Sequence, residues 1–291
     1  MVFRPYGAGN PQIIKFGRNP AIEMIRQERH GVSFYACPDF AWTGAAHGFS
    51  TRLGGVSPAP MDSLNLGANR GDDPANVREN FSRFCAAIGT DVNALVKNHQ
   101  IHSDIIRPVT QDDILDDPAT PGVFQADGLV TDVPGVCLTI FSGDCIPILF
   151  YDPARRCIAA AHAGWRGTAI GIAARAAEAM VRDYGCKAEH LLAAIGPGIA
   201  PCCFETHADV PDGLRAGLGA DAEPFIRPLP KPGKFSVDLK GANARWLERS
   251  GLKREHIAIC PACTACNLDV FWSHRVQGGL RGSMAAMIQL L

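Results

Sequence analysis

The sequence predicts an α+β fold, an α/β sandwich in which helices cover mixed β-sheets within a single domain. From Val136 onward, short runs rich in β-branched and aliphatic residues are typical of buried strands. They alternate with Ala-rich segments whose apolar positions recur at helical spacing. The 291 residues, 47% of them hydrophobic, suffice for one large core. No repeat with a period of about 20–50 residues occurs, which gives solenoid and propeller folds no support.

The first elements are predicted from turn and cap signals. Residues 1–43 look like an irregular N-terminal arm, and residues 44–291 form the main domain. Asp73 followed by Pro74 is typical of a helix N-cap and first helical position, so a helix should run to about Ile88. Gly89 lies just past its expected end.

The centre and the end of the chain predict alternating strands and helices. Three successive runs indicate central strands: VCLTIF, IPILFY and CIAAAHAG. A helix from Gly167 to Tyr184 should follow, with Gly185 as its C-cap. The alternation continues over residues 191–217 and 235–259, and the final SMAAMIQLL indicates a buried strand.

Charge and composition favour a small-molecule ligand. The net charge is -1 and the isoelectric point about 6.7, which gives no electrostatic reason to expect nucleic acid or a membrane as a partner. The first twenty residues lack the apolar core of a signal peptide, and no apolar run approaches the length of about 18 residues of a membrane span. We therefore expect a cytoplasmic protein with mostly reduced cysteines, and an odd count of eleven argues against a disulfide framework. The sequence carries no signal for the oligomeric state.

Three short motifs carry residues that can bind a metal. HQIHS contains His99 and His102, SGDC ends at Cys145 in a break between two expected strands, and AHAGWRGT places His162 at a strand-to-helix junction. Each alone has an ordinary structural explanation, because single histidines are often hydrogen-bonded and buried cysteines are often inert. Ends of strands facing helix starts are, however, where α/β proteins place ligands.

Two imidazole nitrogens and one thiolate would suit zinc or copper and disfavour magnesium or calcium. Three protein ligands would leave one position for water or substrate, the pattern of a catalytic site, since structural zinc sites are usually closed by four ligands. Spacing alone does not establish that the three side chains meet. The hypothesis is one mononuclear zinc site, with copper as the less favoured metal.

The motifs together resemble one known family. HGFSTRLGGVS, SLNLG with GDDP, HQIH, SGDCIPILF, AHAGWRG, AIGPGIAPCCFE and FWSHR occur here in the order expected of the YfiH-like proteins. These are also called polyphenol oxidase or laccase-domain proteins and are identified as purine nucleoside phosphorylases. The resemblance spans His47 to about Met284 and implies that residues 44–291 are a YfiH-like catalytic domain.

The resemblance also implies roles for single residues. His102, Cys145 and His162 match the family's zinc ligands, whereas Arg52, Gln100, Asp144 and Arg166 match residues near the substrate. The sequence departs from the usual pattern at Gly143, where the family commonly has alanine, and at Gly198 and Ala200. These changes should leave the ligands alone but alter the pocket wall.

The implied reaction is the cleavage of purine nucleosides by phosphate, yielding a free base and ribose 1-phosphate. Adenosine, inosine, guanosine and methylthioadenosine are the implied substrates, with adenosine deamination as a related activity. We expect zinc and Arg52 to orient phosphate, or a water molecule in deamination, and Asp144 or a neighbouring histidine to transfer the proton. The preferred base has no signature in the sequence.

Three other functions remain as alternatives. The first is a cytoplasmic hydrolase that edits peptidoglycan precursors, which the resemblance also allows. The second is a copper polyphenol oxidase, which we rank low because only nine histidines are present and none forms an HxH pair. The third is a non-enzymatic module stabilised by zinc. Chelation separates the last from an enzyme, because a structural site loses folding with its metal.

The remaining cysteine motifs predict no function. CPACTAC contains Cys260, Cys263 and Cys266, but no cysteine follows to complete a local run of four. Cys202 and Cys203 are adjacent and lack the usual CxxC spacing. We interpret the first group as reduced loop cysteines and the second as packing residues.

Overall fold

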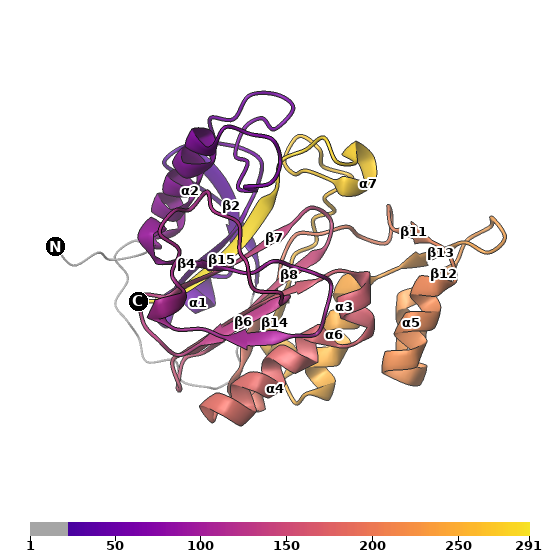
Figure 1. Cartoon of the computed structure of the whole chain (residues 1–291). Helices are drawn as coiled ribbons and strands as arrows, with labels where there is room; N and C mark the ends of the chain where they lie inside the picture. The colour runs from indigo at the N-terminus through magenta and orange to yellow at the C-terminus, as the bar shows by residue number, and fades with distance from the viewer. Residues whose placement is uncertain (1–22) are drawn as a thin grey trace.

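The computed structural model describes residues 23–291 and contains two large sheets. The first has the order β1-β2-β3-β15-β7-β4, with bounds Ile25–Arg29, Val32–Ala36, Ala45–Ser50, Met284–Leu290, Cys137–Ser142 and Leu95–Lys97. Its strands pair antiparallel except for β4, which runs parallel to β7. The C-terminal strand β15 therefore lies between β3 and β7 (Figure 1).

The second sheet carries the residues of the candidate site. Its order is β14-β10-β8-β9-β6-β5, with bounds Ile257–Ile259, Leu192–Ile195, Ile146–Asp152, Cys157–Ala163, Gly128–Thr131 and Ile106–Pro108. The outer pairs β10–β14 and β5–β6 are parallel, and the three inner pairs are antiparallel. Both large sheets are therefore mixed.

A small third sheet and the helices complete the described chain. The third sheet has the order β11-β13-β12, with bounds Glu205–Thr206, Phe235–Val237 and Ile226–Pro228. The helices α1 to α7 span Pro38–Trp42, Pro74–Ile88, Trp165–Ala169, Ile172–Tyr184, Asp209–Leu218, Leu239–Arg249 and His274–Gln277. Short 3₁₀ turns occupy Val92–Ala94, Gln111–Asp113, Ala188–His190, Gly219–Phe225 and Arg254–His256.

Three apolar cores define four layers, helix, sheet, sheet and helix. Phe34, Phe81 and Phe84 pack in the core between the first sheet and α2. Leu138, Leu149 and Ile288 belong to the core between the two large sheets. The third core lies between the second sheet and the helices α4 and α6, and α5 with the small sheet continues it to one end (Figure 1). The α/β sandwich predicted from the sequence is confirmed.

Several predicted elements have the predicted form. Helix α2 begins at Pro74 and ends at Ile88, the Asp73 side chain accepts a hydrogen bond from the Ala75 amide, and Gly89 closes the helix in the left-handed conformation. Strand β15 confirms the prediction for the last residues. The observed bounds of β7, β8 and β9 follow the three predicted central runs.

Two predictions require correction. The helix predicted from Gly167 to Tyr184 is divided into α3 and α4, because Gly171 has a φ of 81° that an α-helix does not accommodate. The irregular arm predicted for residues 1–43 is wrong for its second half, where β1, β2 and α1 form and β2 pairs with β3. Residues 1–22 lie outside the described part. Within residues 23–291, no helix is long and apolar enough to cross a membrane.

Candidate metal centre and pocket

The candidate ligands meet because of the register of three neighbouring strands. Strands β8 and β9 are antiparallel and place Pro147 opposite His162, so Cys145, just before β8, lies beside the end of β9. His102 lies in the loop between β4 and β5. Strand β5, which follows this loop, pairs with β6, the neighbour of β9. Residues separated by tens of positions in the chain thus reach one edge of the sheet.

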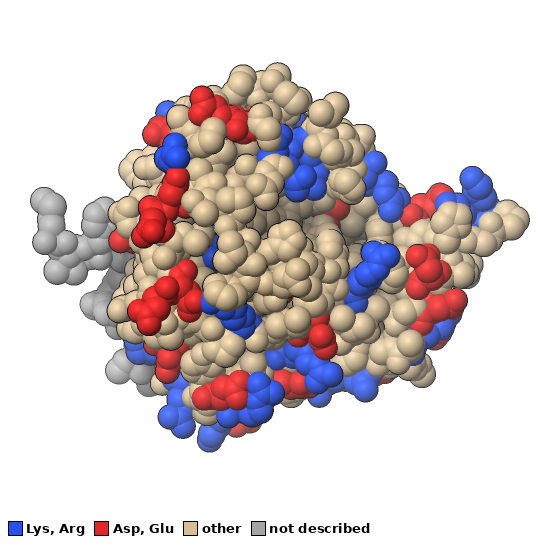
Figure 2. All heavy atoms as spheres, in the orientation of Figure 1, with Lys and Arg blue, Asp and Glu red and all other residues tan. Residues whose placement is uncertain are grey.

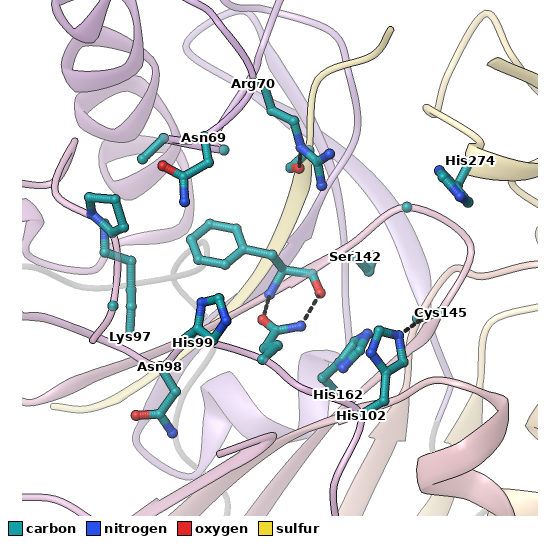
Figure 3. A pocket seen from close by; sticks show the side chains of 18 of the residues that line it. Asn69, Arg70, Lys97, Asn98, His99, His102, Ser142, Cys145, His162 and His274 are labelled. Carbon is teal, nitrogen blue, oxygen red and sulfur yellow. Dashed lines mark hydrogen bonds between the residues drawn. The ribbon is translucent and has the colours of Figure 1, made fainter. Parts of the chain in front are cut away.

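The three side chains have the geometry of a metal site. Their potential ligand atoms all lie within 4.8 Å of one another. The Cys145 Sγ lies 3.9 Å from the His102 Nε2, and the two imidazole rings are 4.9 Å apart at an interplanar angle of 75° (Figure 3). Tetrahedral zinc with Zn–S of about 2.3 Å and Zn–N of about 2.0–2.1 Å requires a sulfur–nitrogen separation of about 3.6 Å. The donor set fits a zinc ion with little adjustment.

Asp127, which the sequence analysis did not identify, holds two of the three side chains. Its Oδ1 lies 2.8 Å from the His162 Nδ1, which leaves the Nε2 of that ring for a metal. Its Oδ2 accepts hydrogen bonds from the amides of Ile101 and Ser103, at 3.1 and 2.6 Å, and from the Ser103 hydroxyl at 2.8 Å. One buried carboxylate therefore fixes both His162 and the loop that carries His102.

The electrostatics of the group favour a thiolate. Burial by itself would raise the pKa of the Cys145 thiol, but the adjacent His162 and His102 imidazoles lower it to about 6. Burial opposes the charged form of His162, yet Cys145 and Asp127 raise its pKa to about 9. The hydrogen bonds to His162 and Ser103 hold the pKa of Asp127 well below its usual value, against the effect of burial. A thiolate is the protonation state that a metal ligand requires.

Two features of the backbone allow the close approach. A Cβ at Gly164 would lie 2.6 Å from the His102 Cδ2 and 3.2 Å from the Cys145 Sγ, so only glycine leaves room for the imidazole. His102 and Asp144 have positive φ angles of 63° and 94°, which residues other than glycine rarely adopt. Such a conformation costs about 1–3 kcal/mol and is concentrated at functional sites.

A cavity of about 450 Å³ opens beside the three side chains. This volume is within the range of about 300–1,000 Å³ found for small-molecule sites. Figure 2 shows a hollow near the middle of this face, with lysine and arginine side chains at its rim. Besides the three candidate ligands, the lining includes Asn69, Arg70, Lys97, His99, Phe141, His274 and Arg281.

Three cationic side chains on the wall were not identified in the sequence. Burial and the nearby Arg70 guanidinium lower the pKa of Arg281 to about 10, and the Arg281 Nε–H is buried without an acceptor among the described residues. Arg70 donates from Nε to the Ser283 hydroxyl at 2.8 Å. Burial lowers the pKa of Lys97 to about 8, and its ammonium donates to the Pro118 carbonyl. Two guanidiniums with unused donors favour an anionic ligand in this cavity.

Gln100 is in the cavity wall, as the resemblance implied, but both ends of its amide are engaged. Its Nε2 donates to the Phe141 carbonyl at 2.9 Å, and its Oε1 accepts from the Phe141 amide at 2.7 Å (Figure 3). Gln100 therefore fixes the position of Phe141 at the edge of β7. Direct contact between Gln100 and substrate stays a prediction.

Arg52 and Arg166 do not line this cavity. Arg52 donates to the carbonyls of Asp62 and Leu268, both at 2.8 Å, and forms an ion pair with the Asp62 carboxylate at 3.1 Å. Arg166 is exposed and its guanidinium stacks on Trp165, 4.4 Å from the ring centroid. The contacts of Arg52 join two loops, and a role in binding substrate stays a prediction for both arginines.

Asp144 is buried and is not among the residues that line the cavity. Its Oδ1 accepts from the Thr264 hydroxyl at 2.6 Å, and its Oδ2 accepts from the Ser273 hydroxyl at 2.9 Å and the Arg275 amide at 2.6 Å. These contacts join the Cys145 loop to residues 264–275. The described hydrogen bonds of its carboxylate are all to these residues, and the catalytic role of Asp144 stays a prediction.

Comparison with known proteins agrees with the motifs. The family described as multi-copper polyphenol oxidoreductase laccase matches residues 46–291. Purine nucleoside phosphorylase YlmD of Geobacillus stearothermophilus is 37% identical over 275 residues, which cover 91% of this chain and 97% of that protein. A purine nucleoside phosphorylase of Deinococcus radiodurans is 37% identical over 262 residues, covering 89% of this chain and 94% of that protein.

A solved structure shows the same fold. The crystal structure of the protein YfiH of Bacillus licheniformis has a TM-score of 0.85 and 31% identity, and the match covers 91% of this chain and 99% of that chain. The family match over residues 46–291 covers the same part of the chain as the sequence motifs, which span His47 to about Met284. The chain therefore belongs to the laccase-like YfiH family, among whose members YlmD is named a purine nucleoside phosphorylase.

Proposed function

We propose that the chain is a zinc-dependent purine nucleoside phosphorylase of the cytoplasm that acts on adenosine, inosine, guanosine and methylthioadenosine. The observation that carries the proposal is a three-ligand group, His102, Cys145 and His162, that opens onto a cavity containing two guanidiniums. The names of the relatives support the reaction class. Three ligands match catalytic zinc, which keeps one position for a non-protein ligand.

The cavity offers partners for both halves of the reaction. Arg70 and Arg281 carry the donors for phosphate, in place of Arg52, whose donors are taken by loop carbonyls. Phe141 supplies an apolar surface for a purine, and Asn69, which is labelled in Figure 3, also lines the cavity. When bound, zinc would add positive charge beside the anionic ligand.

Phosphorolysis breaks the glycosidic C–N bond, forms a bond between C1′ and a phosphate oxygen, and requires a proton for the departing purine. His99 and His274 line the cavity and are better placed than Asp144 to transfer that proton. The Nδ1 of His274 lies 3.1 Å from the Gly278 carbonyl, which leaves its Nε2 for a substrate atom. Adenosine deamination would need water at the position of phosphate in the same cavity.

Product analysis tests this function. The purified protein should release hypoxanthine from inosine, and adenine from adenosine, only when phosphate is added, with ribose 1-phosphate as the second product. Equal rates of base release with and without phosphate would show that the reaction is hydrolysis and not phosphorolysis. Formation of inosine from adenosine would show that the protein also deaminates adenosine. Cleavage of a peptidoglycan precursor in the absence of nucleoside cleavage would favour the editing hydrolase. Reconstitution with zinc or with copper separates the phosphorylase from a polyphenol oxidase.

Gly143→Ala is expected to weaken phosphate binding. An alanine Cβ at this position would lie 2.1 Å from the Arg281 Nη1 and 2.3 Å from its Cζ, so the guanidinium has to move. A charge-assisted hydrogen bond contributes about 1.5–3 kcal/mol, which corresponds to a rise of roughly 10- to 100-fold in the KM for phosphate. Initial rates at saturating inosine and varied phosphate measure this effect.

Gly279→Ala is the matched control. Gly279 lies two positions before Arg281, and a Cβ there meets no atom within 4 Å. This variant should keep the KM for phosphate, and both variants should keep the melting temperature. An unchanged phosphate KM in Gly143→Ala would remove Arg281 from the phosphate site.

A further inference from the structure

Four cysteine sulfurs from two loops form a second group, which shares no residue with the site just described. The ligand atoms of Cys202, Cys203, Cys263 and Cys266 all lie within 4.8 Å of one another. No local run of the sequence contains all four cysteines, so spacing along the chain does not connect the two pairs. Cys263 and Cys266 have the CxxC spacing, and Cys202 and Cys203 complete the set from elsewhere in the chain. Cys260, the other cysteine of CPACTAC, is buried and outside this group.

Parallel strand pairing brings the two loops together. Strands β10 and β14 are parallel neighbours, so the loops that follow them leave the same edge of the second sheet. The contact continues beyond the strands, because Gly198 forms an isolated parallel bridge with Cys263 and the Thr264 amide donates to the Gly198 carbonyl. The cysteines that follow on both loops therefore converge.

The sulfur positions suit a metal ion better than a disulfide. The Cys266 Sγ lies 3.4 Å from the Cys202 Sγ and 3.3 Å from the Cys203 Sγ. A disulfide requires about 2.05 Å, whereas tetrahedral zinc with Zn–S of about 2.3 Å separates its sulfurs by about 3.8 Å. Small movements of the exposed Cys202 and Cys266 side chains bring the group to zinc geometry.

One hydrogen-bond donor and two cations lie close to the four sulfurs. The Ala200 amide donates a hydrogen bond to the Cys263 Sγ at 3.3 Å. The buried Lys240 ammonium donates to the carbonyls of Cys260 and Ala262, at 2.8 and 2.6 Å, and the Arg275 guanidinium donates to the Cys203 carbonyl at 3.4 Å. Four thiolates around one divalent ion carry a net charge of about −2, which these two cations offset.

We propose that Cys202, Cys203, Cys263 and Cys266 bind a second zinc ion in a closed, structural four-thiolate site. The ion would join the loops after β10 and β14. The second of these loops also donates the Thr264 and Ser273 hydrogen bonds to Asp144, the residue before Cys145. The structural site thus stabilises one side of the candidate active site without contacting substrate.

Zinc stoichiometry tests the proposal on the full chain, purified under reducing conditions and measured by inductively coupled plasma mass spectrometry. The wild type should hold about two zinc ions and Cys202→Ser/Cys266→Ser about one, because two remaining thiolates do not complete the site. Cys145→Ala should also retain about one ion, at the four-thiolate site. Cys260→Ala, the matched control in the same loop, should retain about two.

A spectroscopic measurement identifies the ligands without relying on the double variant. Cobalt-loaded Cys145→Ala should show the intense thiolate-to-cobalt charge transfer of a tetrahedral four-sulfur site. The proposal would be overturned if purified Cys145→Ala held no metal and all four cysteines of the group reacted as free thiols. A protein mass about two daltons below the reduced value, from a disulfide among these cysteines, would overturn it too. The result is distinguishable from failure of the proposed function, because loss of the ion at His102, Cys145 and His162 leaves the four-thiolate ion in place.

Discussion

Cys145→Ala is expected to abolish phosphate-dependent release of hypoxanthine from inosine while leaving the protein folded. The substitution removes the only sulfur of the three-ligand group, and two imidazoles alone bind zinc poorly. A metal ion supplies several kcal/mol of charge stabilisation to such reactions, so kcat/KM should fall by at least about 10³-fold. Hypoxanthine release and the melting temperature are measured on the same preparation.

Cys186→Ala is the appropriate control for Cys145→Ala. Cys186 lies in the core between the second sheet and α4. Its sulfur belongs neither to the three-ligand group nor to the four-cysteine group. Its removal should lower stability slightly and leave kcat/KM unchanged. Full activity in Cys145→Ala would reject a catalytic metal at this position, and unfolding of that variant after loss of zinc would favour a structural one.

The sandwich itself was predictable because its signals are local. The Asp73-Pro74 pair, the alternating apolar runs and the final strand depend on residues within one element. The division of the helix at Gly171 was missed because an isolated glycine inside a helical pattern is tolerated at a cost of about 1 kcal/mol and does not by itself predict a break. Strands β1 and β2 were missed because Arg, Gln, Glu and Ser interrupt their apolar pattern.

The candidate ligands were found by motif, but their meeting depends on strand pairing. The register that places Pro147 opposite His162 follows from the pairing of β8 with β9, and the spacing of residues along the chain does not reveal it. Asp127 has no motif, since a single aspartate before a short strand is common. The same reasoning explains why the four-thiolate group was missed: its pairs lie on loops after two strands that are distant in sequence and adjacent in space.

The pocket wall shows what a departure from a family pattern can indicate. In the sequence, Gly143 departs from the family's usual alanine, and this change was expected to alter the pocket wall without any particular wall residue being predicted. In the structure, the missing Cβ leaves the space that the Arg281 guanidinium fills. The departure was thus a sequence signal for Arg281, which became interpretable only when the two residues were placed side by side.

Asp127→Asn is expected to weaken zinc binding by about 10- to 100-fold, the effect typical of losing a carboxylate that orients a metal-bound histidine. The carboxylate accepts from His162 with one oxygen and from the Ser103 amide with the other, and an amide has only one oxygen for both. If the Asn NH₂ group faces His162, it donates to Nδ1 and favours the tautomer with its proton on Nε2. A protonated Nε2 cannot bind a metal. Competition with a chromophoric chelator measures the zinc affinity.

Asp132→Asn provides the matched control, because Asp132 is exposed one residue beyond the end of β6, whereas Asp127 is buried one residue before its start. The control should keep the zinc affinity. If Asp127 acts by orienting His162, excess zinc should restore much of the kcat of Asp127→Asn, because the ligands themselves remain. Unchanged zinc affinity in Asp127→Asn would contradict this role. Weakened affinity with a kcat that stays low at saturating zinc would show that the carboxylate also contributes to the reaction after the metal has bound.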